Sequence, residues 1–155
     1  MRPREVAHRV LQYQTTTRKG SAMKKAFSAI LVVLAISGTA FAGSNYELSV
    51  KAPAAKASEK SVAKIKVVPT NGYKMNLEYP TKVTINAPEG VTLEKAKQSK
   101  GDAVKLDKGS AEFDVAFTAA SAGKKTFTGE MKFAVCTDAT CDNKVEQLSF
   151  TVDVK

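Results

Sequence analysis

Apolar and polar residues alternate with a period of two along most of the segment from residue 43 to residue 155. This alternation is typical of β-strands that bury one face and expose the other. The alternating sets are Tyr46, Leu48 and Val50; Ala63, Ile65 and Val67; Tyr73, Met75, Leu77 and Tyr79; Val83 and Ile85; Val91 and Leu93; Val104 and Leu106; Phe113, Val115 and Phe117; Phe127, Gly129, Met131, Phe133 and Val135; and Leu148, Phe150, Val152 and Val154.

Turn-forming residues separate these sets. Clusters of Pro, Gly, Asn, Asp and Ser occur at 69–72, 86–90, 100–102, 108–110 and 121–124. Eight or nine short strands at this spacing predict an all-β fold, an immunoglobulin-like antiparallel β-sandwich. The Ala- and Lys-rich segment 51–60 contains Pro53, so a loop is at least as good a prediction there as a helical turn.

The segment 23–42 has the three-part layout of a Sec signal peptide. It contains a start-like Met23, the basic pair Lys24 and Lys25, a mostly apolar run over 26–36 and the small-residue ending Ala40-Phe41-Ala42. The apolar run is shorter than the roughly 20 residues that span a bilayer. We therefore expect cleavage after Ala42, a periplasmic or secreted location, and no stable membrane association after cleavage.

Residues 1–22 precede this segment and are longer than an ordinary signal-peptide n-region. They are either the product of an upstream start codon or an extended leader, and the sequence leaves both open. The remaining segment, 43–155, has the length of one domain, and we expect it to be a monomer.

The positive net charge of +9 does not indicate a nucleic-acid partner. Seven of the 24 basic residues but only one of the 15 acidic residues precede residue 43, so the remainder holds 17 lysines against 14 acids. Lysines from Lys95 to Lys108 are interleaved with acids and lack aromatic residues for base stacking, which favours a solvated face.

The distribution of Arg and His along the chain also excludes several kinds of catalytic and binding site. Every Arg and the only histidine, His8, precede residue 43. A monomeric domain over 43–155 therefore has no imidazole for a Ser-His-Asp or Cys-His arrangement and no arginine clamp for phosphate. No hydrolase or transferase site is visible, and we expect no cofactor and no metal site.

The two cysteines, Cys136 and Cys141, are the candidate functional residues. In an exported chain, cysteines this close are most simply a disulfide. Three interpretations remain open: a structural staple, a redox-active pair that exchanges electrons with a thioredoxin-like partner, and capture of a soft metal with Met75 or Met131. Lys132 and Lys144 are the nearest cations in sequence that could lower a thiol pKa, and Asp138 and Asp142 could accept hydrogen bonds in the turn.

Several motifs together resemble one family. They are Gly72-Tyr73 opening a strand, Pro88-Glu89-Gly90-Val91, Ser121-Ala122-Gly123 before the longest strand, and the block from Phe133 through Cys136 to Cys141. They resemble the N-terminal periplasmic domain of the thiol:disulfide interchange protein DsbD over nearly the whole of 43–155.

The resemblance implies an immunoglobulin-like sandwich in which Cys136 and Cys141 exchange electrons with a thioredoxin-like protein. In that family an aromatic cap loop protects the cysteines, whereas the matching stretch 95–102 has no aromatic residue, so we expect an unshielded disulfide. The chain would then be at most a thiol-disulfide carrier. The alternative is a non-enzymatic binding or structural module whose disulfide is only a staple.

Overall fold

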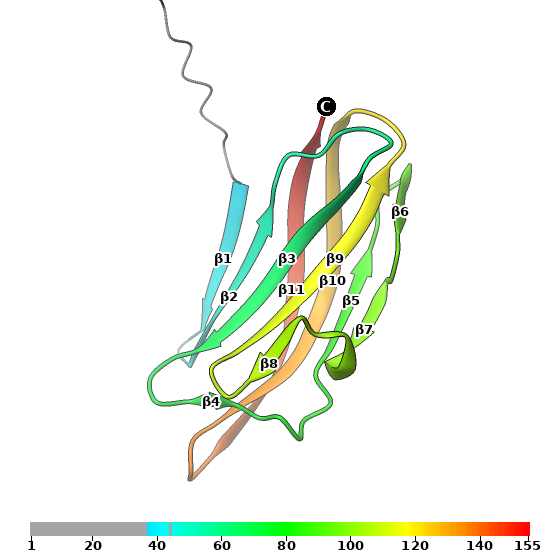
Figure 1. The fold of residues 1–155 in the computed structure, drawn as a ribbon. Coiled ribbons are helices and arrows are strands. Elements are labelled where there is room, and N and C mark those ends of the chain that lie inside the picture. The colour runs from blue at the N-terminus through cyan, green and yellow to red at the C-terminus, as the bar shows by residue number, and fades with distance from the viewer. Residues whose placement is uncertain (1–36, 44) are drawn as a thin grey trace, which may run out of the picture. The chain divides into compact units, whose positions relative to one another are not determined.

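The computed structural model describes residues 37–43 and 45–155, which form two antiparallel sheets (Figure 1). The first sheet has the spatial order β1 (Ser37–Gly43), β2 (Tyr46–Ala52), β3 (Lys60–Pro69), β9 (Ser110–Ala119) and β6 (Val91–Leu93), with β8 (Lys105–Asp107) pairing with β9. The second has the order β11 (Cys141–Val154), β10 (Gly123–Cys136), β5 (Lys82–Asn86) and β7 (Lys97–Ser99), with β4 (Lys74–Met75) pairing with β10. A short 3-10 helix, η1 (Lys100–Asp102), follows β7.

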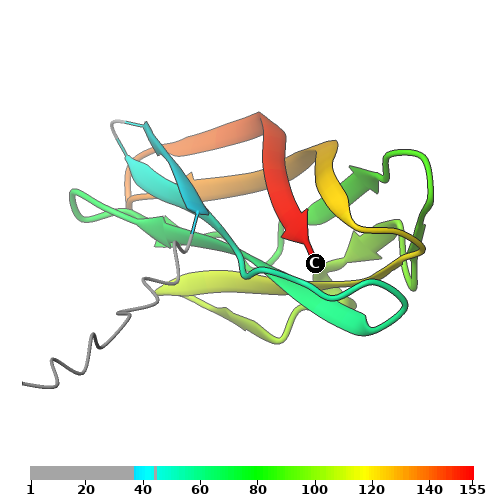
Figure 2. The same ribbon diagram turned by 90° about the horizontal axis from the view of Figure 1, so that it is seen from above.

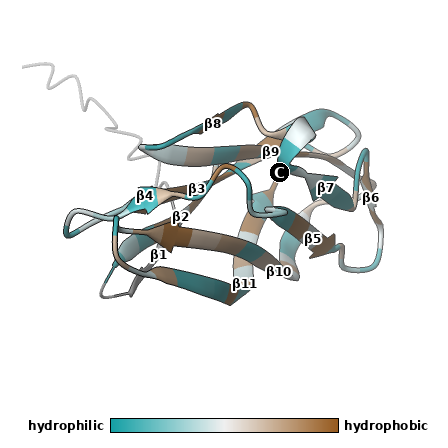
Figure 3. Ribbon diagram, turned by 90° about the horizontal axis from the view of Figure 1, so that it is seen from below, coloured by the Kyte–Doolittle hydropathy of each residue, from teal (hydrophilic) through white to brown (hydrophobic). Residues whose placement is uncertain are grey.

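The period-two pattern produces the core, because every second side chain of each long strand points between the sheets. Figure 2 shows β10 and β11 in one layer and β3 and β9 in the other, and in Figure 3 apolar and polar segments alternate along the strands. The largest side chains of the core are Phe113, Phe117, Phe127, Phe133, Leu48, Ile65, Ile85, Met131 and Leu148.

The strand order confirms the predicted fold class. In an immunoglobulin-like sandwich one sheet has the order A-B-E-D and the other G-F-C. The order β2-β3-β9-β6 matches the first sheet, and β11-β10-β5 matches the second. The described residues contain eleven strands rather than eight or nine. The two that the alternation did not predict are β1, which lies mostly within the predicted signal peptide, and the three-residue β7.

Two local predictions differ from the structure. The predicted strand over 73–79 is only the two-residue β4, because the side chain of Asn76 accepts hydrogen bonds from the backbone N–H groups of Glu78 and Tyr79 and turns the chain. Tyr73 and Leu77 still pack against the core. The stretch 95–102 contains a strand that the pattern did not indicate, β7, which buries the polar Gln98 instead of an apolar residue.

The predicted leader over 1–22 and the start of the predicted signal peptide, 23–36, lie outside the described residues. Residues 37–42, the last part of the predicted signal peptide, form most of β1 and pair with β2. In the described part of the chain no helix has the length and apolar character needed to cross a membrane.

Candidate functional site

The cysteine pair lies at the tip of the longest hairpin, formed by β10 and β11 (the orange tip in Figure 1). The turn closes through a hydrogen bond of 2.8 Å from the Thr137 N–H to the Thr140 carbonyl. The Thr137 hydroxyl accepts further bonds from the N–H groups of Ala139 and Thr140, at 3.3 and 3.2 Å. The Thr137 side chain thus provides an acceptor for two backbone N–H groups of the turn, as Ser and Thr side chains commonly do in loops.

Cys136 and Cys141 are directly opposed in the hairpin register and form a disulfide. Their Cα atoms are 4.0 Å apart, closer than the roughly 4.5 Å of a non-hydrogen-bonded antiparallel pair. The bond therefore closes the last register position before the turn. This confirms the disulfide that the sequence predicted.

The two cysteines differ in exposure. Cys136 is half-buried where β10 leaves the core, immediately after the fully buried Val135, whereas Cys141 is exposed. The stretch 95–102 contributes no aromatic side chain to cover them, because it contains none. Cys141 is therefore the more accessible of the two residues.

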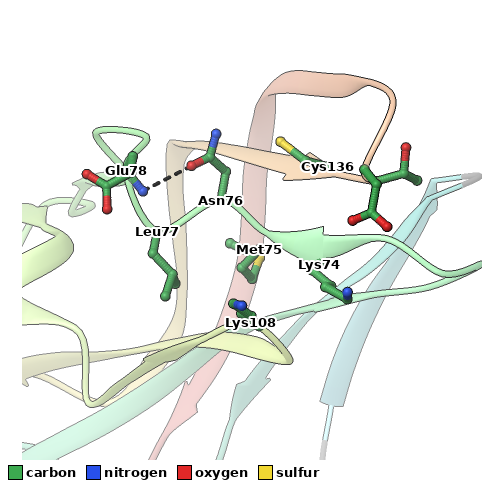
Figure 4. Close-up of a pocket in the computed structure, with 9 residues that line it drawn as sticks. Lys74, Met75, Asn76, Leu77, Glu78, Lys108 and Cys136 are labelled. Carbon is green, nitrogen blue, oxygen red and sulfur yellow. Dashed lines mark hydrogen bonds between the residues drawn. The ribbon is translucent and has the colours of Figure 1, made fainter.

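A groove with a volume of about 420 Å³ opens beside Cys136 (Figure 4). Its walls come from three elements: the segment that contains β4, the turn between β8 and β9, and the hairpin tip. The lining residues are Lys74, Met75, Asn76, Leu77, Glu78, Lys108, Cys136, Thr137 and Asp138. The groove combines an apolar floor at Met75 and Leu77 with two lysines and two carboxylates, so its charges are balanced.

Backbone hydrogen bonds fix the groove wall to both sheets. The Met75 N–H donates to the carbonyl of Lys108 and the Asn76 N–H donates to that of Ala134, both at 2.9 Å. In the register of the second sheet, Lys74 lies opposite Cys136 and Met75 lies opposite Val135. The wall beside Cys136 is therefore hydrogen-bonded to both sheets.

The N-terminal end of β2 is attached to β11 close to the disulfide, which sequence reasoning missed. The Asn45 side-chain amide donates to Asp142, the neighbour of Cys141, and the Tyr46 hydroxyl donates to Glu146. The Tyr46 ring also packs edge-on against Phe133, with centroids 4.9 Å apart. These residues are about 100 positions apart in sequence, so no local pattern could have indicated the contacts.

Burial and this hydrogen bond alter the acidity of Tyr46. Burial, which disfavours the phenolate, raises the pKa of Tyr46 from 10.0 to about 12, with further contributions from the bond to Glu146 and the negative charges of Glu146 and Asp142. Tyr46 therefore stays neutral and remains a hydrogen-bond donor over the physiological range.

The residues that flank the cysteines have roles other than those expected. The turn uses Thr137 rather than Asp138 or Asp142 as its acceptor, and Asp142 instead bonds to Asn45. Lys144 lies 3.6 Å from Asp142, and Lys132 lies 3.1 Å from Glu130. Each lysine is thus next to a carboxylate that offsets its charge.

The soft-metal interpretation gains no support from the arrangement of side chains. Met131 is fully buried in the core and does not line the groove, whereas Met75 lies in its floor. Within residues 37–43 and 45–155 there is no cluster of three or more His, Cys, Asp or Glu side chains able to hold a metal ion.

The lysine-rich stretch is an exposed face that contains ion pairs. Lys95 pairs with Asp102 at 2.6 Å and Lys105 pairs with Asp107 at 3.3 Å. The Lys95 ammonium and the backbone N–H of Ser99 lower the pKa of Asp102 to about 2. The acids that interleave with the lysines thus partly neutralise them, which fits the solvated face expected from the sequence.

Comparisons with known proteins identify no family. No protein-family profile and no curated protein matches the chain. Among solved structures, the GAE domain of GGA2p from Saccharomyces cerevisiae is 13% identical, with 74% of this chain and 97% of that chain covered and a TM-score of 0.38. AggA, the major subunit of aggregative adherence fimbriae type I from Escherichia coli, is 10% identical, with coverages of 77% and 96% and a TM-score of 0.39.

At these identities and TM-scores, no activity or partner passes from either protein to this chain. The class of protein is defined by its own strand order and covalent geometry: an immunoglobulin-like antiparallel β-sandwich with one disulfide at a hairpin tip.

Proposed function

We propose that this chain is an exported, non-enzymatic β-sandwich module that binds a partner, and that its Cys136–Cys141 disulfide is a structural staple. The observation that carries the proposal is the position of the bond, which joins directly opposed residues at the tip of the β10–β11 hairpin. A covalent link there prevents the end of the hairpin from fraying. It also fixes Cys136 and Thr137 as one wall of the groove, which is the surface we assign to the partner.

Removal of the disulfide tests the staple. Closure of a six-residue loop contributes about 2 kcal/mol to the free energy of unfolding by the chain-entropy formula. For a domain of this length we expect the double variant Cys136→Ser/Cys141→Ser to melt roughly 8 °C below the native protein. Thermal unfolding followed by circular dichroism measures the difference, and equal melting temperatures would refute a stabilising role.

A second candidate function is a thiol-disulfide carrier of the DsbD N-terminal type. The exposure of Cys141 favours it, because exchange requires a sulfur atom that a partner can reach. A thiolate of a reduced thioredoxin-like partner would attack the Cys141 sulfur and form a mixed disulfide, releasing Cys136 as the thiolate. The partner's second thiol would then displace Cys141, so that the partner dithiol is oxidised, the Cys136–Cys141 pair gains two electrons, and the two protons pass to its thiolates.

Single-cysteine variants distinguish the two functions. A carrier with this geometry should trap a thioredoxin-like protein as a mixed disulfide in the Cys136→Ser variant, which keeps the exposed residue Cys141. The Cys141→Ser variant, which keeps only the half-buried Cys136, is the matched control and should trap less. Gel analysis without reductant, after thiols are blocked in intact cells, measures both. Trapping by Cys136→Ser alone would favour the carrier, whereas no trapping by either variant would favour the staple.

A further inference from the structure

The strand β2 has an outer edge whose only neighbour, in the part of the chain that the structure describes, is β1. The pairing runs from Ser37 opposite Ala52 to Gly43 opposite Tyr46 and so covers the whole of β2. The sequence predicts cleavage after Ala42, which would remove every residue of β1 except Gly43. The mature protein would then present the N–H and C=O groups of β2 on an open sheet edge, and open edges readily pair with another strand.

The charges on β2 have no partner in this pairing. Glu47, Ser49 and Lys51 point away from the core, and β1 places Ala42, Ala40 and Gly38 opposite them, none of which is charged. On the other side of β2 the neighbours on β3 are Val68, Lys66 and Lys64. Lys51 therefore lies beside a like charge, and among the described residues neither Glu47 nor Lys51 makes an ion pair.

We propose that signal-peptide cleavage frees the edge of β2 to pair antiparallel with β2 of a second copy of this chain, in a two-fold register centred on Ser49. This register places Glu47 of each copy opposite Lys51 of the other. It also places Leu48 opposite Val50, so that buried positions face buried positions and exposed positions face exposed ones. Two copies of one chain thus satisfy both charges, which β1 leaves unpaired.

The proposal rests on export and cleavage, as the proposed function does, and departs from the monomer expected from the sequence alone. The occupant is a second copy because β2 is complementary to itself. An antiparallel copy of β2 presents its outward residues in the reverse order, Lys51, Ser49 and Glu47, so each charge lies opposite its counterpart. Opposite charges directly across an antiparallel pair stabilise it, whereas like charges in the same place destabilise it.

Charge reversals on β2 test the register. The full chain is expressed in a host that exports it, the N-terminus of the recovered protein is determined by mass spectrometry, and its dimer dissociation constant is measured by analytical ultracentrifugation. Either Glu47→Lys or Lys51→Glu replaces two ion pairs with two like-charge contacts, so we expect the constant to rise about tenfold. The double variant Glu47→Lys/Lys51→Glu restores opposite charges and should return it to the native value.

A matched control separates pairing from net charge. Glu89→Lys makes the same change of charge in the turn before β6, at the far edge of the same sheet, and should leave dimerisation unchanged. Circular dichroism confirms that each variant is folded. Three results would each overturn the proposal: a monomeric mature protein, a dimer whose dissociation constant does not change with the charge reversals on β2, or a recovered protein that retains residues 37–42. The cysteine variants described above test the proposed function independently, since they do not alter β2.

Discussion

At the scale of single residues, Tyr46 and Asn45 connect the start of the sandwich to the strand that follows the disulfide. The Tyr46 side chain is 6% exposed, and its hydroxyl donates to the half-buried carboxylate of Glu146. Asn45 donates to Asp142 in the same region. Because both acceptors are carboxylates, these bonds are stronger than hydrogen bonds between neutral groups.

Replacement of Tyr46 measures the contribution of this contact. We expect Tyr46→Phe to lower the free energy of unfolding by about 1.5 kcal/mol, because Glu146 loses its donor while the ring remains packed on Phe133. Urea titration measures the change. Tyr73→Phe is the matched control: Tyr73 also packs against the core, but its hydroxyl has no hydrogen-bond partner within the described residues, so its stability should change little. Equal effects of the two substitutions would contradict this role for Tyr46.

Tyr46 also makes the free energy of unfolding depend on pH. The folded-state pKa of Tyr46 is about 12 and its ordinary value is 10.0, so its contribution to stability is complete below pH 10 and disappears as the pH rises through about 12. Ultraviolet absorbance of tyrosinate should show one group that titrates near 12 and that Tyr46→Phe removes. If the group that Tyr46→Phe removes titrated near 10 instead, the burial argument would be contradicted.

At the scale of elements, the close approach of β5 and β10 depends on one glycine. Gly129 lies opposite Ile85, and a Cβ atom at position 129 would be 2.2 Å from the backbone oxygen of Thr84. The obstacle is backbone rather than a flexible side chain, so the two strands would have to separate.

Gly129→Ala should therefore destabilise the protein by about 2–3 kcal/mol, in the upper part of the range for overpacked cores. Gly101→Ala is the control, because a Cβ atom there meets nothing within 4 Å and the backbone is not in the left-handed region. Chemical denaturation compares the two variants. If Gly129→Ala were as stable as Gly101→Ala, the predicted β5–β10 clash would be refuted.

The alternation predicted the elements that bury large side chains and failed where polar groups control the backbone. The sets around Ile65, Phe113 and Phe133 correspond to β3, β9 and β10. The pattern gave a strand over 73–79 because it cannot detect that the Asn76 side chain takes two backbone N–H groups. It missed β7 because the inward residue is Gln98, which donates to the Asp114 carbonyl at 2.9 Å.

The candidate site was predictable only in its covalent part. Two closely spaced cysteines in a chain with a signal-peptide pattern were enough to predict the Cys136–Cys141 bond. The groove and the contacts of Tyr46 with β11 depend on residues brought together by the packing of the two sheets. Such contacts leave no periodic signal in the sequence.

At the scale of the whole molecule, the apolar core rather than the surface charges holds the two sheets together. Ion pairs between β3 and β9 join Lys64 with Asp114 at 2.8 Å and Lys66 with Glu112 at 2.7 Å. Exposed pairs of this kind add little to stability, so the fold depends on its apolar core. Phe127 links the two sheets within that core, stacking on Phe150 and meeting Phe117 edge-on.

A structural staple requires that the Cys136–Cys141 bond stabilise the fold and not exchange electrons. Its reduction potential is measured by equilibrating the exported protein with glutathione or dithiothreitol buffers and counting alkylated thiols by mass. We expect a value below about −300 mV, the range of structural disulfides that ordinary thiol carriers do not reduce. A value between about −270 and −120 mV would contradict the claim and identify the pair as exchange-active.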